Sequence, residues 1–122
     1  MVEETTASQE TNETQNAPLD MEAVDFGIIA SAGTARSMAF EALKHARVGE
    51  FEEADKLLEQ SRGASLEAHH VQTDLLSRCA GGEDLPVDVL LVHAQDHLMT
   101  SMLAQELITE MVEMYKKLEG AK

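Results

Sequence analysis

The sequence predicts an all-α protein that folds as a single domain. Only 3% of its 122 residues are aromatic and only two are proline, whereas Ala, Leu, Glu and Met are plentiful. These residues favour helices, and the β-branched and aromatic residues that strands prefer are scarce. Turn-forming residues gather near Gly49 and between Gly81 and Pro86, which leaves three long helical segments. Three such helices joined by short turns form an up-down-up antiparallel bundle.

Residues 1–20 are expected to be a disordered acidic tail. They contain five acidic residues, no basic residue and almost nothing to bury, which is typical of segments that do not fold alone. The helical domain is assigned to residues 21–119. Asp20 stands where it can cap the first helix.

The three helices follow from their start and stop signals. The first is predicted over residues 21–48, where Gly49 ends it. The second is predicted over residues 52–80, and the third over residues 87–118 with Pro86 at its start. The buried side of the second helix is predicted to consist of Ala54, Leu57, Leu58, Ala64, Leu66, Ala68, Val71 and Leu75.

The first helix has little side-chain bulk on part of its surface. The small residues there are Gly27, Ala30, Ala32, Gly33 and Ala35. Either a neighbouring helix or another molecule can approach closely at such a surface. Close helix packing inside the bundle is the interpretation we favour.

The charge and composition exclude several classes of function. The net charge is −14, from 23 acidic and 9 basic residues, which disfavours binding to nucleic acid or to anionic membranes. No apolar stretch approaches the roughly 20 residues of a membrane helix, and no signal peptide is recognisable. The single cysteine, Cys79, cannot form a disulfide within the chain. A cytoplasmic protein is therefore expected.

The third helix changes character along its length. In its C-terminal half one face consists of Leu107, Met111, Met114 and Leu118. Extended towards the N-terminus at 100° per residue, that face meets the polar residues His93, Asp96, His97 and Thr100, spaced i, i+3, i+4 and i+7. A polar cluster therefore continues a face that is predicted to be buried. Either the cluster is exposed to solvent, or it lies in a crevice or an interface and has a chemical function.

We compared the kinds of chemistry that this cluster of polar residues could support. A transition metal could bind His93, His97 and Asp96, with His69 or His70 as further ligands, although one helix supplies at most three. No nucleophile motif of a hydrolase and no glycine-rich phosphate loop occurs. The remaining chemistry is a histidine that accepts a phosphoryl group from a donor held on another protein.

The residues around this cluster resemble a known family. The sequence is similar to the lactose/cellobiose class of IIA proteins of the bacterial phosphotransferase system, nearest its chitobiose/cellobiose branch, over about residues 21–118. The segments that carry the resemblance are Val92–Ala104, Ala32–Ser37, Gly49–Phe51, Glu67–His69 and Gln72–Thr73.

The resemblance implies a homotrimer of three-helix protomers and a phosphohistidine intermediate. His93 would be phosphorylated on Nε2 by the phosphocarrier HPr and would pass the group to a cysteine of the cognate IIB protein. The sugar, a β-linked disaccharide, would be phosphorylated during transport through the IIC membrane component. Gln95 and His97 are candidates for stabilising the phosphoryl group in transfer.

The resemblance also implies that Asp96 lies at the trimer axis and helps to bind a divalent metal. Three carboxylates related by a threefold axis would repel one another unless a cation lay among them. Mg²⁺, with waters that complete its oxygen shell, suits such a position, with one ion per trimer.

Two other functions stay open from the residues alone. A histidine phosphotransfer domain of a two-component relay is also a helical bundle with one reactive histidine. Those domains usually carry a Lys-Gly pair just after the histidine, whereas this chain has Asp96 and His97. A helical adaptor without chemistry would leave the polar cluster in solvent.

Overall fold

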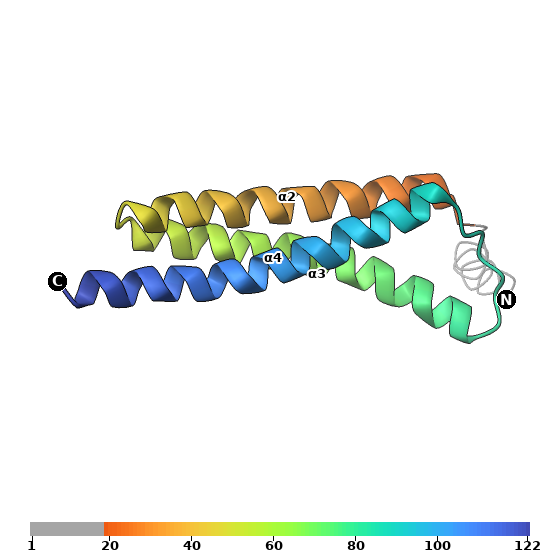
Figure 1. The fold of residues 1–122 in the computed structure, drawn as a ribbon. Coiled ribbons are helices and arrows are strands. Elements are labelled where there is room, and N and C mark those ends of the chain that lie inside the picture. Colours follow the sequence, from red (N-terminus) through yellow and green to blue (C-terminus); the bar gives the residue numbers. More distant parts are fainter. Residues whose placement is uncertain (1–18) are drawn as a thin grey trace, which may run out of the picture.

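The computed structural model describes residues 19–122, and the expected tail therefore lies almost entirely outside the described residues. Within that range the protein consists of three helices: α2 (Met21–Arg47), α3 (Phe51–Ala80) and α4 (Val89–Gly120). Figure 1 shows that α2 and α4 run in the same direction and that α3 runs against them. The predicted all-α, up-down-up bundle is confirmed. None of these helices has an apolar stretch long enough to cross a membrane.

The helix ends mostly follow the sequence signals. Asp20 caps α2 by accepting a hydrogen bond from the backbone N–H of Ala23 at 3.2 Å. Gly49 has a positive φ of 81°, a conformation that glycine adopts without steric cost, so the chain reverses there within three residues.

Helix α4 begins two residues later than predicted. Asp88, and not Pro86, provides its start, because the Asp88 side chain accepts a hydrogen bond from the N–H of Leu91 at 2.9 Å. Pro86 instead lies in the segment that joins α3 to α4.

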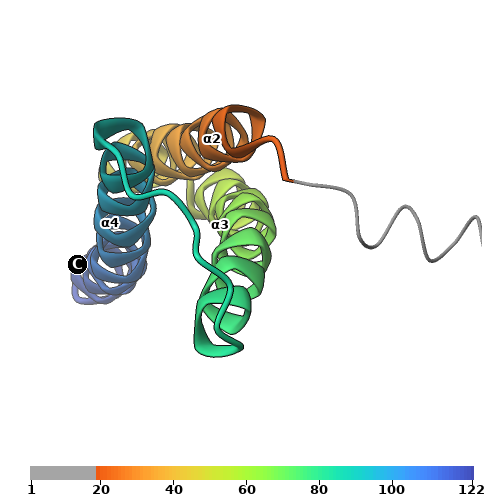
Figure 2. The same ribbon diagram turned by 90° about the vertical axis from the view of Figure 1, so that its right-hand side faces the viewer.

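Helix α2 is the central element, because it packs along both α3 and α4, while those two contact each other over a shorter length. Seen from the end in Figure 2, α3 and α4 separate towards their connecting segment. Every third or fourth residue of α2 is a fully or almost fully buried alanine: Ala32, Ala35, Ala39, Ala42 and Ala46. Their small side chains let two helices lie close against α2, and for Ala32 and Ala35 this confirms the expected close packing.

The core has two apolar parts. The part near the α2–α3 turn contains Ala39, Ala42, Ala46, Ala54, Leu58, Ile108 and Val112. The part at the other end contains Ile28, Ala32, Ala68, Leu75, Ala94 and Leu98. Three buried serines, Ser61, Ser65 and Ser101, stand between these two sets in the sequence of their helices. Ser61 Oγ donates a hydrogen bond to the carbonyl of Ala35 at 2.6 Å, which ties α3 to α2.

The predicted buried side of α3 is partly wrong. Leu66 is 56% exposed and Val71 is 36% exposed. The reason is geometric: α3 separates from α4 in this half, so only a narrow stripe of α3 is covered by α2.

Candidate functional site

The two histidines of the predicted cluster lie together on α4. The ring centroids of His93 and His97 are 4.6 Å apart and the rings are inclined by 73°, an edge-on contact. His93 is exposed, whereas His97 is half-buried. The i, i+4 spacing thus places an exposed histidine on the surface with a second imidazole ring against one side of it.

Helix α2 supplies the neighbours of His97. A groove of about 410 Å³ between α2 and α4 is lined by Gly33, Arg36, Ser37, Phe40, Glu41, Lys44 and His97. The guanidinium of Arg36 lies 5.6 Å from the ring centroid of Phe40, a cation–π contact between two residues of the lining. The sequence argument assigned no role to Arg36 or Ser37, because the periodicity of one helix does not reveal which residues of another lie against it.

The structure does not bring Gln95 to His93 within the protomer. Gln95 lies on the α3 side of α4, where its Oε1 accepts a hydrogen bond from Gln72 Nε2 at 2.5 Å. The same Gln72 nitrogen lies 3.5 Å from the sulfur of Met99. Gln95 thus links α3 to α4, and its role at a phosphoryl group stays a prediction.

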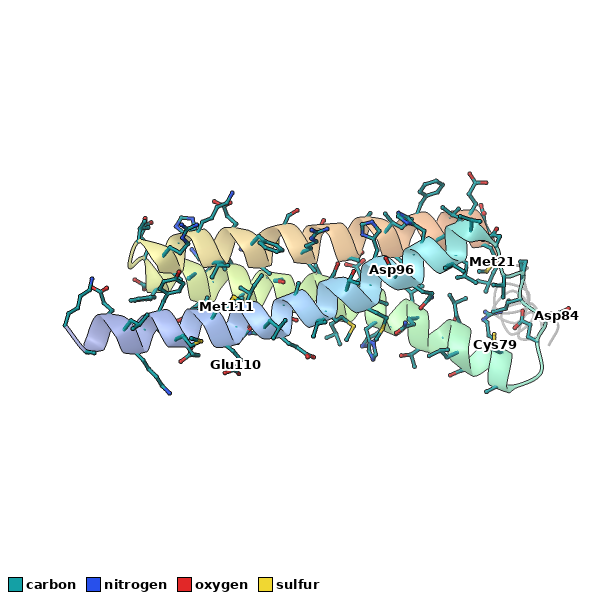
Figure 3. The ribbon with its side chains drawn as sticks, in the orientation of Figure 1. Met21, Cys79, Asp84, Asp96, Glu110 and Met111 are labelled. Carbon is teal, nitrogen blue, oxygen red and sulfur yellow. The ribbon has the colours of Figure 1, made fainter. Side chains whose placement is uncertain are left out.

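Asp96 lies on the exposed side of α4, and Figure 3 labels it together with Met111 farther along the helix. Its backbone carbonyl accepts a hydrogen bond from the hydroxyl of Thr100 at 2.7 Å. Across residues 19–122 no three His, Cys, Asp or Glu side chains are grouped so that they could hold a metal ion. One protomer therefore offers at this point a single carboxylate, which alone does not make a metal site.

The apolar face that continues from Asp96 is not covered within the protomer. We call Leu103, Leu107, Met111, Met114 and Leu118 the outer stripe of α4. These side chains are 42–62% exposed. The side of α4 buried in the protomer is instead formed by Ala94, Leu98, Ser101, Ile108 and Val112, which we call the inner stripe.

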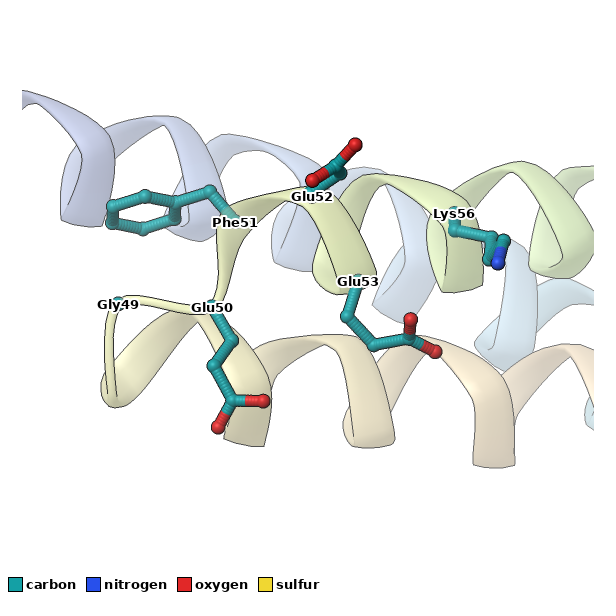
Figure 4. A pocket seen from close by; sticks show the side chains of 6 residues that line it. All are labelled: Gly49, Glu50, Phe51, Glu52, Glu53 and Lys56. Atoms are coloured by element: carbon teal, nitrogen blue, oxygen red, sulfur yellow. The ribbon is translucent and has the colours of Figure 1, made fainter.

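Another hollow of the described surface lies away from the histidine pair and has the wrong charge for a phosphoryl group. It measures about 730 Å³ and is lined by Gly49, Glu50, Phe51, Glu52, Glu53 and Lys56 at the α2–α3 turn. Figure 4 shows that its three glutamate side chains point in different directions. Three carboxylates beside one lysine repel an anion, so this hollow is not a second phosphoryl site.

Comparison with known proteins places this chain in a family. The sequence model described as "PTS system, Lactose/Cellobiose specific IIA subunit" matches residues 23–116. The N,N'-diacetylchitobiose-specific EIIA component of Escherichia coli (strain K12) is 50% identical over 108 residues, which are 88% of this chain and 93% of that protein.

Two solved structures share the fold. The crystal structure of the PTS cellobiose-specific enzyme IIA from Bacillus anthracis has a TM-score of 0.82 and 42% identity, over 88% of this chain and 99% of that one. The IIA(chitobiose) chain in the solution structures of its complex with HPr from Escherichia coli has a TM-score of 0.72 and 50% identity, over 84% and 99% of the two chains. The chain therefore belongs to the lactose/cellobiose-specific IIA family of the phosphotransferase system and is a phosphotransferase component.

Proposed function

We propose that this protein is a cytoplasmic phosphoryl carrier in the uptake of a β-linked disaccharide, with His93 as the residue that carries the phosphoryl group. HPr is the donor, and a cysteine of the cognate IIB protein, which works with the IIC membrane component, is the acceptor. The observation that carries the proposal is the exposure of His93 on a rigid helix with the His97 ring against it. An exposed histidine can be reached by two different proteins in turn, as a carrier requires.

The transfer uses the imidazole of His93 as a nucleophile. Its Nε2 lone pair forms a bond to the phosphorus of phosphorylated HPr, while the bond from phosphorus to HPr breaks and leaves its electron pair on HPr. In the second step the IIB thiolate attacks the same phosphorus, and the N–P bond breaks and returns its electron pair to Nε2. The protein mainly has to position the reactants and stabilise charge on the equatorial oxygens.

The IIA–HPr complex among the similar structures supports HPr as the donor. The names of the similar proteins differ in their sugars, chitobiose in one and cellobiose in another. A carrier of this kind meets only proteins, and the sugar is therefore defined by the IIB and IIC partners.

The outer stripe supports a homotrimer as the working form. Exposed Leu and Met side chains in a continuous row mark an interface between protein molecules. Asp96 lies at one end of that row, so three copies would bring three carboxylates together. They would suit a divalent cation such as Mg²⁺, one per trimer, because this ion binds oxygen ligands and retains water. The residues of one protomer fit this site only in part, and symmetry has to complete it.

The test is phosphorylation of the intact chain. We expect the protein to gain one phosphoryl group, measured by mass, when it is incubated with phosphoenolpyruvate, the first phosphotransferase enzyme and HPr. His93→Ala should abolish the gain, whereas His70→Ala, which removes an exposed histidine of α3, should leave it intact. A folded wild-type protein that gains no phosphoryl group would contradict the proposal and favour a non-catalytic helical adaptor.

A further inference from the structure

We propose that the groove between α2 and α4 is an anion subsite in which Arg36 and Ser37 bind the oxygens of the phosphoryl group on His93. This inference rests on the proposed carrier function and names residues of α2 that complete its site. His97 is one of the residues that line the groove, and its ring lies against that of His93. A phosphoryl group on His93 therefore lies beside a residue of the groove's lining.

Arg36 has the charge and the freedom to bind an anion. No carboxylate of residues 19–122 forms an ion pair with it, although acidic residues outnumber basic ones by more than two to one in this chain. Its contact with Phe40 limits the positions of the guanidinium without using its hydrogen-bond donors. A guanidinium presents these donors in a planar fork that matches two phosphate oxygens.

The other charges of the groove are already paired. Glu41 is the acidic residue in the lining, and its carboxylate lies 3.6 Å from Lys44 Nζ and 3.7 Å from His45 Nε2. The repulsion between Glu41 and an incoming phosphoryl group is thereby reduced. Among residues 19–122, Arg36 is left as the cation of the groove that forms no ion pair.

Gly33 keeps space open in this groove. A Cβ atom added at this position would meet no other atom within 4 Å, so packing within the protomer does not require glycine here. A glycine inside a helix lowers helix stability by about 1 kcal/mol relative to alanine. A ligand that enters the groove would use the open space beside Gly33, which accounts for a glycine at this position. The Ser37 hydroxyl can then donate a further hydrogen bond to that ligand.

The test compares two arginines of α2 on the full chain. Arg36→Gln should slow single-turnover phosphorylation by HPr by about a hundredfold to a thousandfold, as the loss of one charge-stabilising donor does. Arg36→Lys should restore part of the rate. Arg47→Gln removes a second α2 arginine that lies outside the groove and should change nothing.

A second measurement separates phosphoryl binding from docking of the donor. In purified phosphorylated protein, a nearby guanidinium favours the dianionic phosphoryl group. Arg36→Gln should therefore raise the pH midpoint of the ³¹P chemical-shift titration, and Arg47→Gln should leave it unchanged. A rate loss with an unmoved midpoint would show that Arg36 serves docking only and would overturn the proposal.

A third experiment tests the proposal by filling the groove with a larger side chain. Gly33→Leu should slow phosphorylation, whereas Gly63→Leu, at an equally open helical position of α3, should not. Helix content by circular dichroism shows whether each variant folds. Equal rates for the two glycine variants would contradict the subsite. Absence of phosphorylation in the wild type would instead refute the carrier function itself, so the two failures are distinguishable.

Discussion

The inner and outer stripes of α4 lie on nearly opposite sides of one helix and differ in what covers them. The inner stripe runs from Ala94 to Val112 and is buried against the other two helices. The outer stripe carries larger Leu and Met side chains, yet 42% or more of each remains exposed. A helix that is apolar on two sides is typically covered on both. The inner stripe holds the protomer together, and the exposure of the outer stripe is the observation on which the proposed trimer rests.

The largest expected effect comes from breaking the outer stripe. Leu107→Glu places a carboxylate at the middle of the proposed interface, where it meets its symmetry mates. We expect the trimer to dissociate to monomers in light scattering, because burying unpaired like charges is strongly unfavourable. The protomer should keep its helix content, since Leu107 is 51% exposed within it.

Two controls make this result specific. Glu106→Gln alters an exposed neighbour on the polar side of α4 and should leave the trimer intact. Asp96→Leu should keep the trimer and abolish its response to a chelator, because the carboxylates that would bind the metal are gone. A wild-type protein that is monomeric at all concentrations would remove the assembly role of both the outer stripe and Asp96.

The inner stripe should respond in the opposite way. Leu98 is fully buried, so Leu98→Ala should lower the free energy of unfolding of the protomer by about 2–5 kcal/mol. Urea titrations of Leu98→Ala in the monomeric Leu107→Glu variant should give this loss of unfolding free energy at every protein concentration. Leu107→Ala, the matched change on the outer stripe, should cost stability only where the protein assembles. Equal costs at the two positions in the monomer would contradict the distinction.

The sequence predicts where the helices begin and end better than it predicts which residues of each helix the other helices cover. Asp20 and Gly49 mark helix ends by local chemistry, and both act as expected. Leu66 and Val71 were assigned to the core wrongly, since periodicity does not show where α3 separates from α4. The contact between His93 and His97 could be predicted from the sequence, because residues four apart lie on the same face of a helix. Arg36, by contrast, joins His97 only through packing between helices.

Asp25 sharpens the comparison, because it is a polar residue buried on the inside of the molecule, 1% exposed on α2, with no hydrogen bond to its Oδ1. Burial raises the pKa of its carboxyl above the usual 3.8, and repulsion from Asp88 at the start of α4 raises this pKa further. Above the raised pKa the ionised carboxylate therefore destabilises the folded state. As the pH falls through that pKa towards 3.8, Asp25 takes up a proton and the penalty disappears.

Asp25→Asn should accordingly stabilise the protein at neutral pH, because the amide keeps the shape of the carboxylate and removes the buried charge that Asp88 repels. The gain should shrink as the pH approaches 4, because the wild-type carboxyl is then neutral as well. Urea titrations at both pH values measure it, with Asp84→Asn in the exposed α3–α4 connection as the control. Destabilisation at neutral pH would show that the carboxylate has a favourable partner. Stabilisation would show that the buried interior of the protomer keeps one unfavourable charge, whereas the outer stripe places only uncharged side chains at the proposed interface.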